Sequence, residues 1–376
     1  MINRILFSDV KDKLLNSTKI VVLYGARQVG KTTLVQEIIK DLGLKSLSIN
    51  ADEQKYIDVF SQRDLNKMLL VVEGYELLFI DEAQRITDIG INLKILHDAK
   101  PNLKIIVTGS SSFELANKTK EALTGRTWTF TLYPISVSEL RQEHNLFEIN
   151  DLLEQILLYG MYPDVINLPN QQDKIRFLNE LTTAYLYKDV FELSNIKYPE
   201  KLKKLLQLLA FQAGSEVSLN EIANSLDINR VTVESYIDLL EKSFVIFRLS
   251  GFSRNLRKEI SKMDKIYFYD LGVRNALINN FNSIDIRNDN GALWENFLVI
   301  ERLKNNHYQN RFVQSYFWRI YTGAELDYIE EQNGELHGFE FKFTKKIIKA
   351  PKSWQENYPT ATFECINRSN YWDFVL

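Results

Sequence analysis

Apolar and polar positions change their spacing several times along the chain, and these changes mark out strands and helices. Runs of mainly apolar residues lie at 20–24, 77–80 and 104–107, and polar residues or glycine follow each run. At 44–49, apolar and polar residues alternate. A strand covered on both faces reads as such a continuous run. Between the runs, apolar residues recur at helical spacing at 2–16, 34–42 and 58–70. A fifth strand is expected at 128–132. This order predicts an α/β domain with a parallel sheet.

Beyond residue 133 the spacing becomes helical. Helices are expected at 152–159 and 174–193, with a break at Gly160–Pro163 that favours a hinge or a loop. Further helices are expected at 202–209, 219–226 and 231–240, before a strand-like stretch at 244–249. Ser218 and Glu221 have the spacing of a capping box at the start of the second of these helices. This group resembles a winged helix-turn-helix, whose last helix can enter a DNA major groove.

The last helix of that group carries side chains of both signs. Arg230, Thr232 and Ser235 are suited to contact DNA. Glu234 and Asp238 lie on the same face and oppose the approach of a phosphate backbone. DNA binding and a structural or protein-contact role therefore both stay open.

The C-terminal part predicts a helix from Leu293 to about Asn306, followed by strands at 312–321, 325–329 and 336–343. Asn333–Gly334 has the composition of a hairpin turn between the last two strands. Because successive side chains of a strand alternate, Glu340 and Lys342 share one face of the last strand, and its phenylalanines share the other.

Acidic residues on this frame form a candidate site. Asp327 lies one hairpin away from Glu340, and Glu295 is carried by the preceding helix. The arrangement resembles the PD-(D/E)xK nucleases. That resemblance implies that Asp327 and Glu340 hold Mg²⁺, that Lys342 supports the attacking water or the developing charge, and that Glu295 completes the metal shell. Cleavage and binding alone both stay open, because a fold can persist without its activity.

The strand at 20–24 runs into a loop with the spacing G-x-x-x-x-G-K-[ST], which is the phosphate-binding loop, or Walker A motif. Gly25 and Gly30 allow the backbone to approach a phosphate closely. Lys31 is expected to neutralise the β- and γ-phosphates, and Thr32 to bind Mg²⁺. The predicted nucleotide-binding residues are Gly25, Ala26, Arg27, Gln28, Val29, Gly30, Lys31, Thr32 and Thr33.

The apolar run at 77–80 ends in Asp81 and Glu82, as a Walker B motif does. The carboxyl end of a parallel strand opens at the ligand crevice of the sheet. Asp81 is therefore expected to hold Mg²⁺, with Thr32. Glu82 is expected to orient and polarise the attacking water, which is general-base chemistry.

Two further catalytic candidates flank the last core strands. The strand at 104–107 ends in Thr108-Gly-Ser-Ser-Ser, where a hydroxyl such as that of Ser110 can sense the γ-phosphate or, alternatively, cap the next helix. Arg126 precedes the fifth strand. It is either an arginine finger, acting on its own nucleotide or on that of a neighbouring subunit, or a surface arginine paired with a carboxylate.

Taken together, the Walker A loop, the Ile-Asp-Glu-Ala-Gln motif, the hydroxyl-rich strand end and the Leu-Thr-Gly-Arg segment resemble prokaryotic AAA+ ATPases. More narrowly, they resemble archaeal and bacterial AAA+ proteins that carry a C-terminal domain of uncharacterised function. The resemblance implies ATP binding, hydrolysis with Mg²⁺, and a sheet of strand order 5-1-4-3-2. It also implies that the helical stretch after residue 133 is a lid.

Composition narrows the class of protein. A hydrophobic content of 45% and a charged content of 25% are typical of an ordered chain. A net charge of −3 does not indicate nucleic-acid affinity over the whole chain, so such affinity needs a local patch. The single cysteine excludes an internal disulfide and a multi-cysteine zinc site. With neither a signal peptide nor a bilayer-length apolar run in view, we expect a cytoplasmic protein without a membrane partner.

The sequence thus predicts an ATPase core at 1–135, a helical lid at 136–197, a winged helix-turn-helix at 198–250 and a nuclease-like α/β domain at 251–376. The expected function is ATP hydrolysis that couples nucleotide state to C-terminal domains acting on nucleic acid. The alternatives are a signalling or scaffold NTPase that gates a protein partner, and an ATP-dependent endonuclease. DNA, through the winged helix and the C-terminal domain, and further copies of the chain are the partners considered.

Overall fold

The computed structural model describes residues 2–376 except 111–122, 193–195, 197, 255–262 and 345. Contacts between Cα atoms divide the chain into two compact units, each described by itself below. The first comprises Met1–Pro134 with Lys242–Phe244, and the second comprises Ile135–Glu241 with Val245–Leu376. The residues expected to form the lid, the winged helix and the nuclease-like domain therefore cluster together.

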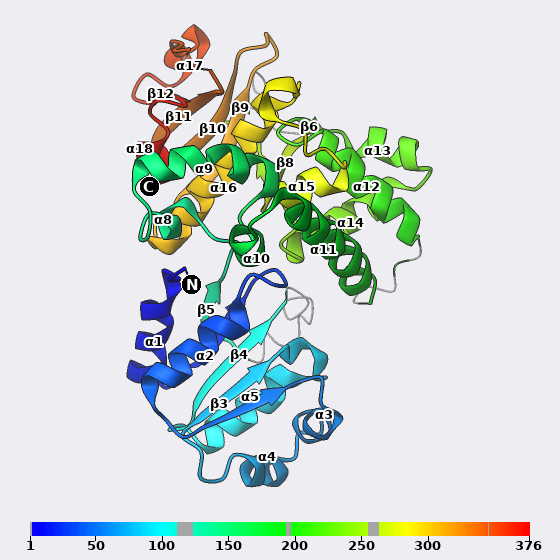
Figure 1. The fold of residues 1–376 in the computed structure, drawn as a ribbon, viewed down its shortest axis with the longest axis vertical. Coiled ribbons are helices and arrows are strands. Elements are labelled where there is room, and N and C mark those ends of the chain that lie inside the picture. The colour runs from blue at the N-terminus through cyan, green and yellow to red at the C-terminus, as the bar shows by residue number, and fades with distance from the viewer. Residues whose placement is uncertain (1, 111–122, 193–195, 197, 255–262, 345) are drawn as a thin grey trace. The chain divides into compact units, whose positions relative to one another are not determined.

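The first unit is built on a parallel sheet of five strands in the order β2-β3-β4-β1-β5 (Figure 1). The predicted order 5-1-4-3-2 is confirmed. The strands are β1 (Ile20–Tyr24), β2 (Ser46–Asn50), β3 (Leu77–Asp81), β4 (Lys104–Gly109) and β5 (Thr127–Thr131). The helices are α1 (Leu6–Asn16), α2 (Lys31–Leu42), α3 (Gln54–Phe60), α4 (Leu65–Val71) and α5 (Ile89–Ala99).

Alternation within the strands supplies the core of this unit. Ile20 and Val22 of β1 join a buried cluster with Ile80 of β3 and Val107 of β4. The single helix expected at 58–70 is two helices, α3 and α4. Arg63 between them takes a positive φ of 56°, and the Asp64 carboxylate then caps α4 by accepting from the Lys67 amide at 3.2 Å.

The second unit begins with helices and continues through two sheets (Figure 1). Its first helices are α8 (Val137–Leu140), α9 (Leu146–Tyr159), α10 (Pro163–Asn167) and α11 (Gln171–Glu192). A three-stranded sheet of order β6-β8-β7 follows. It is interleaved with helices in the sequence α12 (Pro199–Phe211), β6 (Glu216–Val217), α13 (Leu219–Leu226), α14 (Arg230–Lys242), β7 (Ile246–Ser250), β8 (Asp264–Phe268) and α15 (Leu271–Leu277).

The C-terminal sheet of this unit has the order β12-β11-β10-β9, with β11 antiparallel to β10 and parallel to β12. Its elements are α16 (Asn290–Tyr308), β9 (Gln314–Arg319), β10 (Glu325–Gln332), β11 (Glu335–Lys342), α17 (Lys352–Asn357), β12 (Thr362–Asn367) and α18 (Trp372–Val375). Strand β12 has no counterpart in the sequence prediction.

Buried polar contacts join the start of the second unit to α16. The Val137 amide at the start of α8 donates to the Glu301 carboxylate of α16 at 2.7 Å. Lys304 donates to Glu301 at 2.7 Å and to the Ile135 carbonyl at 3.1 Å. Both charged side chains are 1% exposed. A buried ion pair survives only when its remaining hydrogen-bonding capacity is met, as the amide and the carbonyl do here.

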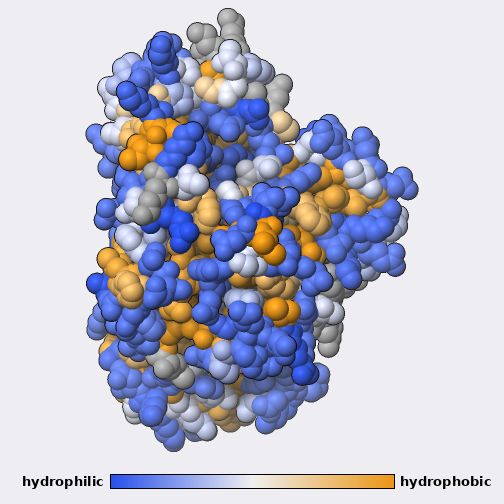
Figure 2. Space-filling view, turned by 45° about the horizontal axis from the view of Figure 1, so that its top comes forward, coloured by the Kyte–Doolittle hydropathy of each residue, from blue (hydrophilic) through white to orange (hydrophobic). Residues whose placement is uncertain are grey.

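Side chains at the surface are mostly hydrophilic. Figure 2 shows hydrophobic residues on the visible face in separate groups among hydrophilic ones. Scattered exposed apolar residues are ordinary in folded proteins. Within the described ranges, no helix is both long and apolar enough to cross a bilayer.

Candidate functional site

The loop between β1 and α2 depends on its glycines. Gly25 has a φ of 152°, and a Cβ built on it would lie 2.2 Å from the Leu132 carbonyl oxygen. Gly30 has a φ of 93°, a region that side chains other than glycine rarely adopt. The loop can therefore hold this path only with glycine at both predicted positions.

Lys31 begins α2 and folds back over the loop that precedes it. Its ammonium donates to the carbonyls of Gly25 and Ala26, both at 2.9 Å, and the residue is 5% exposed. The positive charge thus lies inside the curve of the loop, next to the helix N-terminus. Both favour an anion at this position.

Thr32 and Asp81 meet although they come from different elements. The Thr32 hydroxyl donates to the Asp81 carboxylate at 2.8 Å, from the first turn of α2 to the end of β3. Both groups offer hard oxygen atoms, which are the ligands that Mg²⁺ prefers. These residues therefore fit the magnesium ion that a phosphate-binding loop uses.

Thr108 is a member of this site that the sequence analysis did not single out. It lies on β4, is fully buried, and donates from its hydroxyl to the Asp81 carboxylate. The same hydroxyl accepts a hydrogen bond from the Glu82 amide at 3.3 Å. Thr108 thus holds both acidic residues of the Walker B motif. Its place at the end of the strand beside β3 was the available signal.

Glu82 occupies a left-handed conformation, with a φ of 53°, directly after β3. Its carboxylate accepts a hydrogen bond from the side-chain amide of Gln84. The side chain is partly buried rather than enclosed. A carboxylate held by one neutral donor stays available as a hydrogen-bond acceptor for water, as the predicted general base must.

Ser110 directly follows β4 and is 7% exposed. Its predicted role as a γ-phosphate sensor stays a prediction. Ser111 and Ser112 lie outside the described residues.

The position of Arg126 disagrees with one of the two roles predicted for it. Its guanidinium donates to the Asp98 carboxylate at 3.0 and 3.2 Å. It precedes β5, which is parallel to β1, so it lies at the amino edge of the sheet, whereas the loop at 25–30 leaves the carboxyl edge. A strand of five residues separates these edges by about 16 Å. This placement is at odds with a finger on the chain's own nucleotide, and action on a second copy stays a prediction.

Arg4 is a second contributor that the sequence analysis missed. Its guanidinium donates to the Val29 carbonyl and the Tyr133 carbonyl, both at 2.6 Å. It therefore ties the phosphate-binding loop to the chain that follows β5. No motif spacing marks this residue, so only the tertiary structure reveals it.

The second unit brings the predicted acidic residues together. The Asp327 carboxylate accepts from the Phe341 amide at 2.8 Å, and Lys342 donates to Glu340 at 2.6 Å. Asp327 is 7% and Glu340 8% exposed. Burial and the nearby Asp327 carboxylate both raise the pKa of Glu340. The convergence of Asp327, Glu340 and Lys342 agrees with the predicted geometry.

Glu295 joins this cluster through residues of β8. Lys265 lies 2.9 Å from the Glu295 carboxylate and 3.7 Å from that of Asp327. The Tyr267 hydroxyl donates to Glu295 at 2.7 Å. Burial, opposed by Lys265, raises the pKa of Glu295 to about 7. Neither β8 residue was a sequence candidate, because no strand was predicted at residues 264–268.

Metal binding at this cluster finds no support in the arrangement of ligands. Across the described parts of the chain, no three acidic, histidine or cysteine side chains are grouped so as to hold a metal ion. The Mg²⁺ predicted between Asp327 and Glu340, a site of two carboxylates, stays a prediction.

The exposed face of α14 carries Arg230 and Glu234, as expected for a helix whose other face is buried. Asp238 on this helix is bound within the chain, since Arg248 donates to it at 2.7 Å and to Glu241 at 2.6 Å. This ion pair offsets part of the negative charge that the sequence places on the face.

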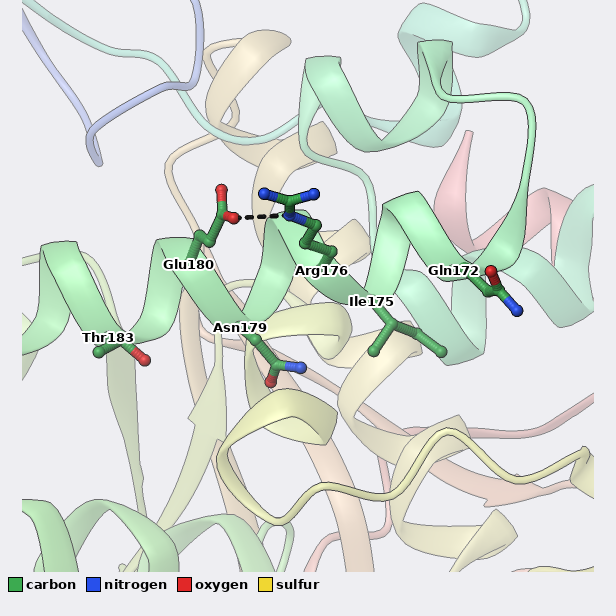
Figure 3. Close-up of a pocket in the computed structure, with 6 residues that line it drawn as sticks. All are labelled: Gln172, Ile175, Arg176, Asn179, Glu180 and Thr183. Atoms are coloured by element: carbon green, nitrogen blue, oxygen red, sulfur yellow. Dashed lines mark hydrogen bonds and ion pairs between the residues drawn. The ribbon is translucent and has the colours of Figure 1, made fainter.

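A separate depression of about 720 Å³ lies along α11 (Figure 3). Among the described residues, those that line it all come from this helix, and Arg176 pairs with Glu180 across one turn at 2.9 Å. It contains none of the predicted site residues. We assign it no role.

Three protein-family models match successive parts of the chain. Residues 17–141 match a family model described as an AAA domain. Residues 150–284 and 290–367 match two models described as domains of unknown function, DUF8612 and DUF4143. The latter two matches attach no chemistry to the second unit.

Relatives extend over most of the chain. An uncharacterized protein of Mycobacterium tuberculosis, Rv2008c, is 29% identical over 337 residues, covering 88% of this chain and 72% of its own length. One of Methanocaldococcus jannaschii, MJ1544, is 25% identical over 365 residues, covering 92% of this chain and 77% of its own length. The similarity thus includes both units.

Among solved structures, the Walker-type ATPase PABY2304 of Pyrococcus abyssi is similar in fold. The TM-score is 0.52 at 17% identity, and the match covers 74% of this chain and 96% of that one. Together with the order of the parallel sheet and the AAA match, this similarity shows that the first unit has the fold of an AAA-type P-loop ATPase core.

Proposed function

We propose that the protein binds ATP with Mg²⁺ at residues 25–33 and hydrolyses it, and that its nucleotide state controls the action of the second unit on nucleic acid. The contact of Thr32 with Asp81 carries the first part of the proposal. It joins the Walker A helix to the Walker B strand at a distance where one cation can take oxygen ligands from both.

The chemistry follows from the charges in this site. Backbone amides of the loop and the Lys31 ammonium bind and orient the phosphates, and they offset negative charge that develops during transfer. Mg²⁺, when bound, supplies further charge neutralisation at the phosphate oxygens. Glu82 accepts a hydrogen bond from the attacking water and orients it toward the γ-phosphorus. The Thr108 hydroxyl holds the Asp81 carboxylate and the Glu82 backbone in fixed positions relative to each other.

Nucleotide binding and turnover test this part separately. Lys31→Ala removes the ammonium from the loop and is expected to abolish binding of a fluorescent ATP analogue. Glu82→Gln is expected to keep binding and to lower turnover by at least about a hundredfold, since general-base catalysis contributes about that much or more. Lys40→Ala and Glu37→Gln, both exposed on α2, are matched controls. Equal turnover in the wild type and Glu82→Gln would overturn the role of Glu82.

The order of elements in the second unit supports nucleic acid as its ligand. This order is that of a winged helix-turn-helix and runs through α12, β6, α13, α14, β7 and β8. ATP turnover is measured with and without duplex DNA at fixed salt. We expect DNA to stimulate ATP turnover. Arg230→Ala should reduce this stimulation, and Lys204→Ala should leave it unchanged. Absence of any DNA response favours the alternative in which the nucleotide gates a protein partner.

A further inference from the structure

The acidic cluster of the second unit contains a cation of its own. Lys265 reaches from β8 to within 2.9 Å of Glu295 on α16 and 3.7 Å of Asp327 on β10. The residue is 7% exposed. One buried ammonium therefore lies between carboxylates from two other elements.

Hydrogen bonds from the protein also engage each of the three carboxylates. Tyr267 donates to the same Glu295 oxygen as Lys265, at 2.7 Å. The Phe341 amide donates to Asp327, and Lys342 donates to Glu340. Mg²⁺ and Mn²⁺ need several oxygen atoms free to turn toward them. Here each of the three carboxylates already accepts from the protein.

Strand β8 is held in place beside α16. The side chain of Asn296 accepts from the Phe268 amide at 2.9 Å and donates to the Phe268 carbonyl at 2.8 Å. Asn296 and Phe268 are both fully buried. Lys265 precedes Phe268 on this strand, so the clamp fixes the backbone from which the ammonium extends.

From this geometry we infer that Lys265 takes the place of a divalent cation between Glu295 and Asp327, so that the second unit balances this buried charge without a metal ion. Several carboxylates this close repel one another in a buried site unless a cation offsets them. A metal ion could enter between Glu295 and Asp327 only by displacing Lys265. That would leave the ammonium buried without its partners, which is strongly unfavourable.

Substitution of Lys265 tests the inference in the full-length, nucleotide-free chain. Asp81→Asn is introduced throughout to remove an acidic ligand at the phosphate-binding loop. Bound Mn²⁺ is measured by electron paramagnetic resonance, and melting temperature is measured with and without Mn²⁺. Without a change at Lys265, we expect no Mn²⁺ bound by the cluster and no Mn²⁺-dependent rise in melting temperature.

Lys265→Met removes the ammonium but keeps most of the length of the side chain. We expect it to lower the melting temperature and to create a Mn²⁺ site whose occupancy restores stability, because a ligand that binds the folded state stabilises it. Adding Asp327→Asn should remove that rescue. Lys174→Met is the matched control, since this buried lysine donates to the amide oxygen of Gln155. It should show no rescue.

Two results would overturn the inference. The first is Mn²⁺ binding by the chain with Lys265 intact that Asp327→Asn or Glu340→Gln abolishes. The second is a folded Lys265→Met variant that gains no Mn²⁺ affinity. If Lys265→Met does not fold alone, the double variant with Glu295→Gln removes a negative charge together with the positive one. Recovery of folding by this pair supports the inference, and failure to recover counts against it.

Discussion

The Thr32 hydroxyl and the Asp81 carboxylate are joined by a 2.8 Å hydrogen bond across 49 positions of sequence. Thr32→Val removes this donor and the oxygen ligand that it offers. We expect a loss of at least about tenfold in Mg²⁺-dependent nucleotide affinity, since a hydrogen bond to a charged group contributes about 1.5–3 kcal/mol. Titration of a fluorescent ATP analogue with and without Mg²⁺ measures this loss of affinity. Thr32→Ser keeps the hydroxyl and should retain affinity, and equal affinities for the valine and serine variants would refute the assignment.

Thr108 should act on turnover more than on binding. Thr108→Val leaves the Asp81 carboxylate and the Glu82 amide without their shared hydroxyl, so Glu82 loses its orientation. We expect kcat to fall about tenfold or more while nucleotide affinity changes about threefold or less, as for loss of one oriented hydrogen bond. Steady-state kinetics and analogue binding separate the two effects. Thr108→Ser restores the hydroxyl and should recover kcat, whereas a serine variant as slow as the valine variant would indicate a packing role.

Arg126→Ala should leave ATP turnover within about twofold of wild type. The side chain is engaged with Asp98 near the amino edge of the sheet, and a surface ion pair contributes at most about 1 kcal/mol to stability. Turnover is measured over a range of protein concentrations. A large loss that grows with concentration would instead show that Arg126 acts on the nucleotide of a second copy.

Glu295 should make stability depend on pH. Burial, opposed by Lys265, raises its pKa from 4.5 to about 7, so the folded state binds a proton more tightly than the unfolded state. Its contribution is therefore present at pH values below the unfolded pKa and is lost as pH rises through the folded pKa. The magnitude is at most about 3 kcal/mol.

Glu295→Gln cannot titrate, so subtracting its urea-unfolding free energies from those of the wild type isolates this contribution. We expect the unfolding free energy of the wild type to fall relative to that of the variant as pH rises. Most of this fall should occur between pH 4.5 and pH 7. Asp285→Asn, at a position outside the cluster, is the control. A flat difference would show that Glu295 has an ordinary pKa.

Much of the first unit could be predicted from local pattern because β1, β3 and β4 are buried on both faces and its motifs have fixed spacing. Glycine at positions 25 and 30 is required by backbone angle, and the acidic residues follow directly from the end of β3. Thr108 could have been inferred from the same rule, since β4 ends beside β3. Arg4 could not, because its partners are backbone carbonyls up to 129 positions away.

The second unit was harder to anticipate. Alternation correctly places Glu340 and Lys342 together, because period two is a local property of a strand. Lys265 and Tyr267 reach the same cluster only because β8 pairs with β6 and β7 and lies beside α16. A strand that the sequence analysis did not predict thus supplies the charge that changes the chemistry of the site.

The contacts of Glu301 and Lys304 with the backbone of Val137 and Ile135 also affect the order in which a nascent chain can fold. On the ribosome, the first unit has all five strands of its sheet once β5 has emerged. Helix α8 emerges next, but its Val137 amide finds Glu301 only after another 164 residues. Contacts so distant in sequence form slowly, and their unpaired surfaces stay exposed meanwhile. The first unit can therefore complete its sheet during synthesis, whereas the second unit closes only when α16 has been made.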